Sequence, residues 1–169
     1  AGYTERSRDT DIAEIMLLLD NFSKIILPLG EKFNGTLVKK IGDCFMYTFE
    51  QPIDGVLASL EIQKTLKGYN AKRVENEQLH TRIGLNTGKV FMKEGDVFGD
   101  PVNIASRIES NAPHDGILIN ESTFEGVKEL VNYEKMEPMI VKGADDPLQT
   151  YLILDSLPGV LEMYLKTNS

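Results

Sequence analysis

Apolar residues recur every three or four positions in two long segments of the chain, which is the spacing of one face of an α-helix. The first segment follows Ser, Asp and Thr residues that can cap a helix, and we expect Pro28 to end or kink it. The second covers residues 52–72, with Gly68 near its end. The apolar positions are Ile12, Ile15, Met16, Leu19, Phe22 and Ile26, then Ile53, Val56, Leu57, Leu60, Ile62 and Leu66.

Shorter runs of β-prone residues lie between and after these helices. Residues 36–50 predict two strands joined at Gly42-Asp43, because a Gly-Asp pair between two such runs indicates a hairpin. Residues 80–100 predict a second strand pair, turned at residues 86–88. The remaining expectations are short helices at 101–113 and 123–130, a strand at 116–122, two strands around a turn at 143–146, and a C-terminal helix within 159–169.

The order of these elements predicts an α+β fold. One additional strand before the first helix would give a ferredoxin-like βαββαβ core with additional C-terminal strands and a helix, and the given chain lacks that first strand. Two helices on one face of an antiparallel sheet would leave the other face open to a partner or a ligand.

Composition narrows the classes of protein that remain. With 169 residues, 41% of them apolar, the chain can form one domain with a substantial core. Its net charge of −8 disfavours general binding to nucleic acid, and no apolar run approaches the roughly 20 residues of a membrane span. A single cysteine, Cys44, excludes a disulfide within the chain and suits a reducing compartment; we expect it to be a small buried residue.

A few polar residues are candidates for chemistry. Asp43, held in the hairpin turn, could supply a hard oxygen ligand to Mg²⁺, or it could be a simple turn former. Asn103 and Arg107 share one face of a short helix and could grip a ribose and a phosphate, or be solvated surface residues. Taken singly, each favours the structural interpretation. His80 and His114 form no spaced ligand set, and we expect each at the surface or a strand end.

Four motifs occur in order along the chain, and together they point to a known family. They are "KKIGDCFM", "HTRIGLNTGKV", "GDVFGDPVNIASRIES" and "IVKGADDPLQTYLI". This set resembles the catalytic domain of the class III nucleotidyl cyclases, which comprise adenylate and guanylate cyclases. The opening "AGYTERS" is similar to that family's first strand-to-helix junction, with Tyr3 in place of a phenylalanine. The resemblance implies a catalytic domain over residues 1–155 and a tail, able to form a helix, over residues 156–169.

The resemblance also implies a role for individual residues. Members of the family convert a nucleoside triphosphate into a 3′,5′-cyclic nucleotide and pyrophosphate with two divalent metal ions, Mg²⁺ or Mn²⁺. Asp43 matches the second of two metal-binding aspartates, and the first is expected upstream of Ala1. The other matches are Asn103 to the residue that orients the ribose, Arg107 to the arginine at the α-phosphate, Lys142 to the lysine at the terminal phosphates, and Tyr3 and Thr4 to the turn that cradles the triphosphate.

The choice of base follows from two further matches. Lys39 and Asp96 occupy the positions that read the base in this family. A lysine and an aspartate offer the donor and the acceptor that complement N1 and the amino group of adenine, whereas guanine presents the reverse and is matched by a Glu–Cys type of pair. The backbone of Val97 would lie beside the adenine. The resemblance therefore implies an adenylate cyclase acting on ATP.

Partners and location follow from the same resemblance. The family's active sites lie between two subunits, and this chain carries residues of both halves, which implies a homodimer with shared sites. We expect fusion to a regulatory or sensor domain outside the chain, and a location in the cytoplasm or in the cytoplasmic part of a membrane-anchored protein.

Three alternatives to an adenylate cyclase stay open. The first is a non-catalytic nucleotide-binding or regulatory dimerisation module, suggested by the absent first aspartate. The second is a guanylate cyclase. The third is a cyclase that makes a dinucleotide, which the turn "IGDCF" disfavours because such enzymes carry a Gly-Gly-Asp/Glu-Glu-Phe turn.

Overall fold

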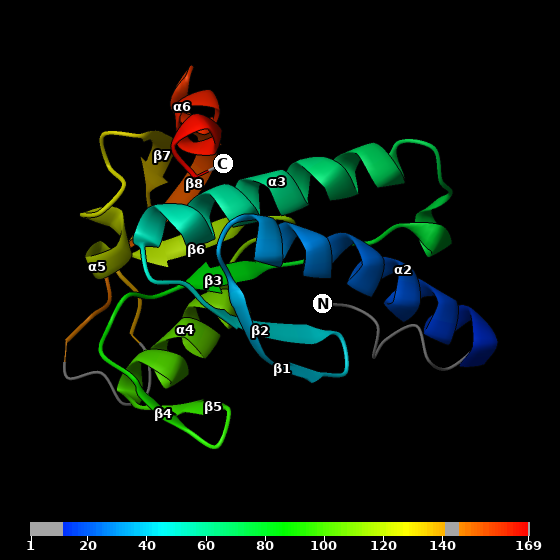
Figure 1. Cartoon of the computed structure of the whole chain (residues 1–169), viewed down its shortest axis with the longest axis horizontal. Helices are drawn as coiled ribbons and strands as arrows, with labels where there is room; N and C mark the ends of the chain where they lie inside the picture. The colour runs from blue at the N-terminus through cyan, green and yellow to red at the C-terminus, as the bar shows by residue number, and fades with distance from the viewer. Residues whose placement is uncertain (1–11, 141–145, 169) are drawn as a thin grey trace.

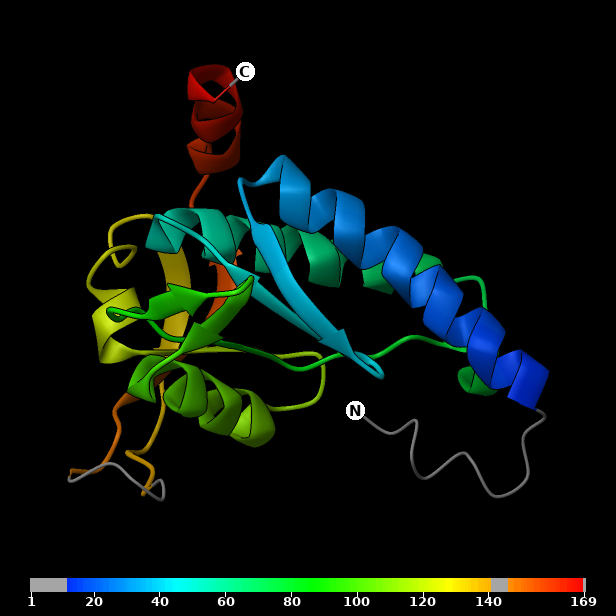
Figure 2. The ribbon, with the colours of Figure 1, turned by 60° about the horizontal axis from the view of Figure 1, so that its bottom comes forward.

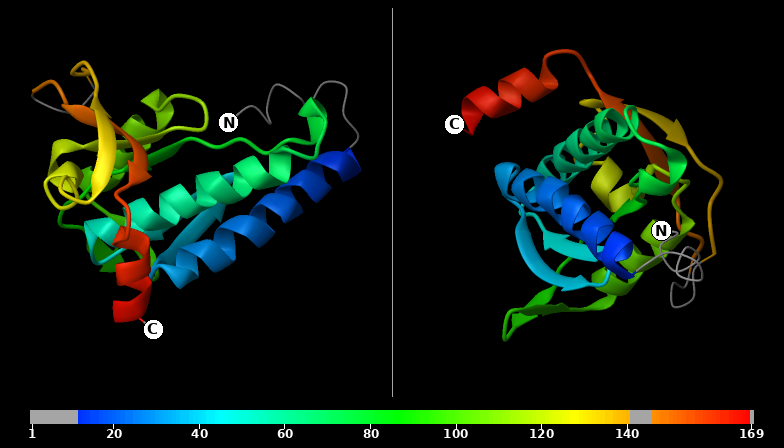
Figure 3. Two further views of the ribbon diagram at one scale, coloured as in Figure 1. Left: turned by 90° about the horizontal axis from the view of Figure 1, so that it is seen from above. Right: turned by 90° about the vertical axis from the view of Figure 1, so that its right-hand side faces the viewer.

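Two long helices, α2 (Ile12–Lys32) and α3 (Pro52–Asn70), lie side by side in the computed structural model, which describes residues 12–140 and 146–168 (Figures 1 and 3). Phe22 and Ile26 of α2 pack against Ile62 and Leu66 of α3, as the helical spacing predicts. Of the two outcomes expected at Pro28, an end of the helix is wrong, because α2 continues to Lys32. The proline removes one backbone hydrogen bond, and packing of the last turn against the hairpin that follows offsets this loss.

That hairpin consists of β1 (Thr36–Ile41) and β2 (Cys44–Thr48), as predicted. Ile41 pairs with Cys44, so Gly42 and Asp43 form a two-residue turn. Gly42 has a φ of 61°, a backbone conformation that glycine adopts without steric cost. The expectation that Cys44 is buried is wrong: beside this turn, its side chain is exposed.

A four-stranded sheet forms the centre of the molecule, in the order β3-β6-β8-β7. Strands β3 and β6 are parallel, and the other neighbouring pairs are antiparallel. The chain enters β3 after a short 3-10 helix, η1 (Glu75–Glu77). The strands are β3 (Ile83–Leu85), β6 (Ile117–Asn120), β7 (Val131–Lys135) and β8 (Thr150–Ser156), and α5 (Glu121–Phe124) follows β6.

Helices cover both faces of this sheet, which corrects the expectation of an open face (Figures 1 and 2). Ile117 and Ile119 of β6 pack in the cluster that contains Val56 of α3. Leu118, on the opposite face of the same strand, packs with Ile108 of α4 (Asp100–Asn111). Alternate residues of β6 therefore contact different helices, as the period of a strand requires.

The second hairpin differs from its prediction. The turn expected at residues 86–88 lies instead at Glu94-Gly95, between β4 (Phe91–Lys93) and β5 (Asp96–Phe98). Both turn residues have positive φ, 53° and 79°, as a tight hairpin turn needs. β3 pairs with β6 rather than with β4, because α4 returns the chain parallel to β3.

The mixed α+β class is confirmed, whereas the ferredoxin-like arrangement stays a prediction. Strands β1 and β2 make their own two-stranded sheet, and so do β4 and β5. β1 nevertheless contacts β5, which places the two hairpins side by side. This contact between the two hairpins brings Lys39 of β1 next to Asp96 of β5.

The last helix, α6 (Val160–Thr167), lies beside the end of α2 and the start of α3 (Figure 3). The ring of Tyr164 stacks on Phe33, and its hydroxyl donates a 2.6 Å hydrogen bond to Asp54. Asn34 donates to the same hydroxyl. Burial, reinforced by the hydrogen bond to Asp54, raises the pKa of Tyr164 well above its ordinary value.

Candidate active site

Lys39 and Asp96, the two predicted base-reading residues, form an ion pair although 57 positions separate them. The Lys39 Nζ atom lies 2.7 Å from Oδ1 and 2.8 Å from Oδ2 of Asp96. Lys39 comes from β1 and Asp96 from β5, so the contact between the two hairpins creates the pair. The two side chains remain 38% and 36% exposed, which leaves both within reach of a ligand.

The Asp96 carboxylate is fixed from two sides. The hydrogen bonds from Lys39 and from the backbone N–H of Val97 lower the pKa of Asp96, the lysine having the larger effect. The Val97 N–H lies 2.8 Å from Oδ1, and the Val97 side chain is buried. Asp96 is therefore an ionised acceptor with a defined orientation at neutral pH.

Asn103 and Arg107 lie on α4, which begins directly after β5. Gly99 precedes the helix with a φ of 136°, and Pro101 occupies its first turn. Both Asn103 and Arg107 are exposed, and neither side chain makes a hydrogen bond or ion pair to another residue within 12–140 or 146–168. Their capacity to donate hydrogen bonds is therefore available to a ligand.

Asp43 is half-buried in the turn of the first hairpin. The turn gives its backbone a defined conformation, and a carboxylate is a hard oxygen ligand suited to Mg²⁺ or Mn²⁺. The predicted phosphate-binding residues Tyr3, Thr4 and Lys142 lie outside the described residues. Of the predicted set, the structure joins Lys39, Asp96 and Val97 by hydrogen bonds.

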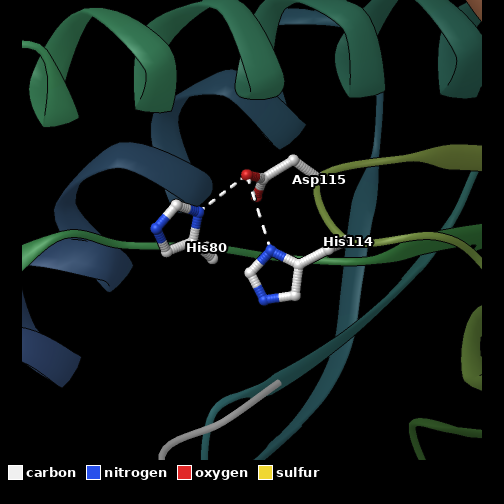
Figure 4. A group of neighbouring side chains, drawn as sticks. All are labelled: His80, His114 and Asp115. Carbon is white, nitrogen blue, oxygen red and sulfur yellow. Dashed lines mark hydrogen bonds and ion pairs between the residues drawn. The ribbon is translucent and has the colours of Figure 1, made fainter. Parts of the chain in front are cut away.

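The structure also assembles a cluster that the sequence did not suggest. His80, His114 and Asp115 place one nitrogen or oxygen atom each within 4.8 Å of the others, which corrects the expectation that the two histidines are unrelated (Figure 4). The signal that could have revealed it is the parallel pairing of β3 with β6, since Ile83 lies opposite Ile117.

Comparison with known proteins identifies the family. The Adenylate and Guanylate cyclase catalytic domain family matches residues 1–155. The chain belongs to this family. An adenylate cyclase of Streptomyces coelicolor is 29% identical over 119 residues, which make up 70% of this chain and 30% of that protein.

Solved cyclase structures share the fold. The catalytic core of a rhodopsin-guanylyl cyclase with converted specificity, in complex with ATPalphaS, superposes with a TM-score of 0.83 at 27% identity, covering 93% of this chain and 92% of that one. The adenylyl cyclase CyaB from P. aeruginosa gives 0.77 at 27% identity, covering 93% and 90%. The cyclase domain is thus supported in both sequence and structure.

Length and hydropathy add two facts about this cyclase domain. The chain spans 15 to 30% of the length of the first curated relatives that it matches. Within the described residues, none of the helices has the length and apolar character needed to cross a membrane.

Proposed function

We propose that this domain is an adenylate cyclase, which converts ATP into 3′,5′-cyclic AMP and pyrophosphate. The observation that carries the proposal is the ion pair of Lys39 with Asp96. A cation that donates hydrogen bonds, beside a carboxylate that accepts them, complements N1 and the amino group of adenine. Guanine presents the reverse pattern, so the Lys39 donor would face another donor and the Asp96 acceptor would face another acceptor.

The residues of α4 supply the groups that the reaction needs elsewhere. Asn103 orients the ribose, so that its 3′-oxygen faces the α-phosphorus. Arg107 donates hydrogen bonds to the α-phosphate as negative charge develops on its oxygens. Lys142, with the backbone at Tyr3 and Thr4, binds the terminal phosphates and the departing pyrophosphate. The exposure of Asn103 and Arg107 supports these roles.

Asp43 fits one ligand position for a divalent ion, because its carboxylate is half-buried in a well-defined turn. Asp43 is one carboxylate of the proposed pair, and the other aspartate is expected upstream of Ala1. When bound, Mg²⁺ or Mn²⁺ provides Lewis acidity that favours ionisation of the 3′-hydroxyl and neutralises the phosphates. Asp43 would supply an oxygen ligand to this ion.

We propose a homodimer with two shared sites as the active form. The hairpin β4–β5 exposes Phe91, Met92 and Phe98 by 77%, 61% and 51%, and Ile41 beside Asp43 is 66% exposed. Phe91 and Phe98 lie opposite each other in the hairpin, and exposed apolar side chains favour a protein interface. A twofold axis through such an interface would bring Asp43 of one protomer to the nucleotide held by Arg107 of its partner.

The domain is proposed to work within a longer, regulated protein in the cytoplasm. The small share of each curated relative that the chain matches supports fusion to a regulatory or sensor domain. The exposed Cys44 suits a compartment that keeps thiols reduced.

The direct test is product formation from ATP and from GTP, each with Mg²⁺ or Mn²⁺, measured by chromatography. We expect cyclic AMP from ATP, with a kcat/KM at least about tenfold above that for GTP. A preference for GTP would identify a guanylate cyclase instead. Nucleotide binding in calorimetry with no product from either substrate would identify the non-catalytic module.

Mixing two inactive variants tests the shared site separately. If each site takes Asp43 from one protomer and Arg107 from the other, a mixture of Asp43→Asn and Arg107→Ala chains contains heterodimers with one intact site. We expect such a mixture to recover about a quarter of wild-type activity, since about half of the dimers would be mixed. No recovery from chains that exchange subunits would contradict a shared site.

A further inference from the structure

We propose that His80, His114 and Asp115 form a binding site for a divalent transition-metal ion of the Zn²⁺ type. The chain contains two histidines, and the fold brings both beside the same carboxylate (Figure 4). His80 precedes β3, whereas His114 and Asp115 lie in the turn between α4 and β6. This site is additional to the metal position expected at Asp43.

The distances between the donor atoms suit an ion with short bonds. Nδ1 of His80 lies 2.7 Å from Oδ2 of Asp115, and Nδ1 of His114 lies 3.7 Å from the same oxygen. Ligands at about 2.0–2.2 Å from a tetrahedral Zn²⁺ are about 3.3 Å apart. The observed distances fall on either side of this value, so rotation of the exposed side chains suffices to place three ligands around one ion.

The second ring nitrogen of His80 and the second carboxylate oxygen of Asp115 are already bonded in the way that metal sites need. Nε2 of His80 lies 3.2 Å from Oε1 of Gln78, and the Gln78 amide nitrogen donates to the Arg73 carbonyl. Oδ1 of Asp115 accepts a hydrogen bond from the Thr81 N–H. Such outer partners orient a ligating imidazole and carboxylate. They leave Oδ2 of Asp115 facing Nδ1 of His80 and Nδ1 of His114 (Figure 4).

The type of donor selects the type of ion. Two imidazole nitrogens and one carboxylate oxygen suit Zn²⁺, and also Co²⁺ or Ni²⁺, whereas Mg²⁺ and Ca²⁺ prefer oxygen ligands alone. Binding replaces the proton shared between His80 and Asp115 with the ion, and that proton leaves to solvent. Three protein ligands leave a fourth position for water.

The backbone explains why the cluster exists without a metal. Ile83 pairs with Ile117 in parallel strands, and the backbone N–H of Ile83 donates to the Gly116 carbonyl. Residues 80 and 114 therefore lie at the same end of neighbouring strands. An ion there would close a loop that contains β4, β5 and α4, and closing a long loop stabilises the folded state.

The test is a Zn²⁺ titration of the tag-free 169-residue chain by calorimetry, with excess Mg²⁺ present to fill carboxylate sites. We expect one Zn²⁺ per chain and a higher melting temperature. His114→Ala removes a ligand that is 64% exposed, so the fold should tolerate it. Asp115→Asn keeps a residue that accepts the φ of 57° while removing the charge. Each variant should weaken the affinity for Zn²⁺ at least about tenfold and abolish the thermal shift.

Cys44→Ser is the matched control, because Cys44 is the single thiol in the sequence and is exposed. It should bind Zn²⁺ with unchanged affinity. The proposal is overturned if the wild-type chain binds no Zn²⁺, if both variants bind it as tightly as the wild type, or if Cys44→Ser alone removes binding. Since the readout is binding and melting temperature, its failure is distinguishable from a lack of cyclase activity.

Discussion

Two groups of polar residues in this domain differ in how far their hydrogen-bonding atoms already have partners within the protein. The nucleotide set, Lys39, Asp43, Asp96, Asn103 and Arg107, includes exposed side chains on α4 that contact no other described residue through hydrogen bonds. The imidazole cluster, His80, His114 and Asp115, is hydrogen-bonded internally and to its surroundings. The difference indicates distinct uses: Asn103 and Arg107 have donors available to an external ligand, whereas the imidazole cluster is stable when empty and exchanges one hydrogen bond for an ion.

The largest expected effect comes from Asp43→Asn, which keeps a turn-forming residue but removes the proposed metal ligand. We expect cyclase activity to fall about 10³-fold, because the ion contributes several kcal/mol to stabilisation of the transition state. Zn²⁺ affinity should not change if the two groups are independent. Asp20→Asn, on the exposed face of α2, is the control and should retain activity. Activity within tenfold of wild type would remove Asp43 from the metal site.

Arg107→Ala should lower kcat about 10²- to 10³-fold, since it removes a charged donor at the phosphate on which charge develops. Arg107→Lys should recover only part of the loss, because a lysine lacks the planar fork. Steady-state assays of both variants, beside Ser106→Ala on the same helix, provide the measurement. Equal losses in Arg107→Ala and Ser106→Ala would indicate a disturbed helix rather than a lost phosphate contact.

The pair Lys39→Glu with Asp96→Cys should exchange the specificity for the base. We expect the ratio of kcat/KM for ATP over GTP to fall about 10- to 100-fold, since donor and acceptor are reversed. Competition assays with both triphosphates give the ratio directly. Lys39→Glu alone places two carboxylates together and should impair both substrates. An unchanged ratio in a folded double variant would show that the base is read elsewhere.

The smallest expected effect is on the stability of the fold, and it involves neither the nucleotide nor the metal ion. Tyr164→Phe leaves the Asp54 carboxyl, which is 5% exposed, without its donor from α6. We expect the free energy of unfolding to fall by about 1–3 kcal/mol. Tyr133→Phe is the matched control, because Tyr133 is 44% exposed and its hydroxyl has no hydrogen bond to the described residues. Chemical denaturation of both variants tests this, and equal stabilities would mean that α6 is not anchored by Tyr164.

Individual elements show how much of the fold could be predicted from the sequence. The two long helices and the first hairpin followed from periodicity and the Gly42-Asp43 turn, because these signals are local. The helix expected at residues 123–130 is wrong, because α5 ends at Phe124 and turns follow it. The turn of the second hairpin was misplaced, since Asn86-Thr87-Gly88 has turn composition whereas Glu94 is an unusual residue at positive φ. Gly84 helps to explain why β3 pairs with β6 instead of β4. Its lack of a side chain lets α4 pack closely on β3, where a Cβ atom would lie 2.2 Å from the Glu109 nitrogen.

The sequence by itself determined the class of fold, the family resemblance and the identity of Lys39 and Asp96 as a matched donor and acceptor. Only the tertiary structure decided that α4 covers the second face of the sheet and that His80 meets His114 and Asp115. The physical reason is that periodicity and turns are encoded by neighbouring residues. The alignment of two parallel strands, in contrast, depends on how the intervening helix packs. No short stretch of the sequence determines this packing.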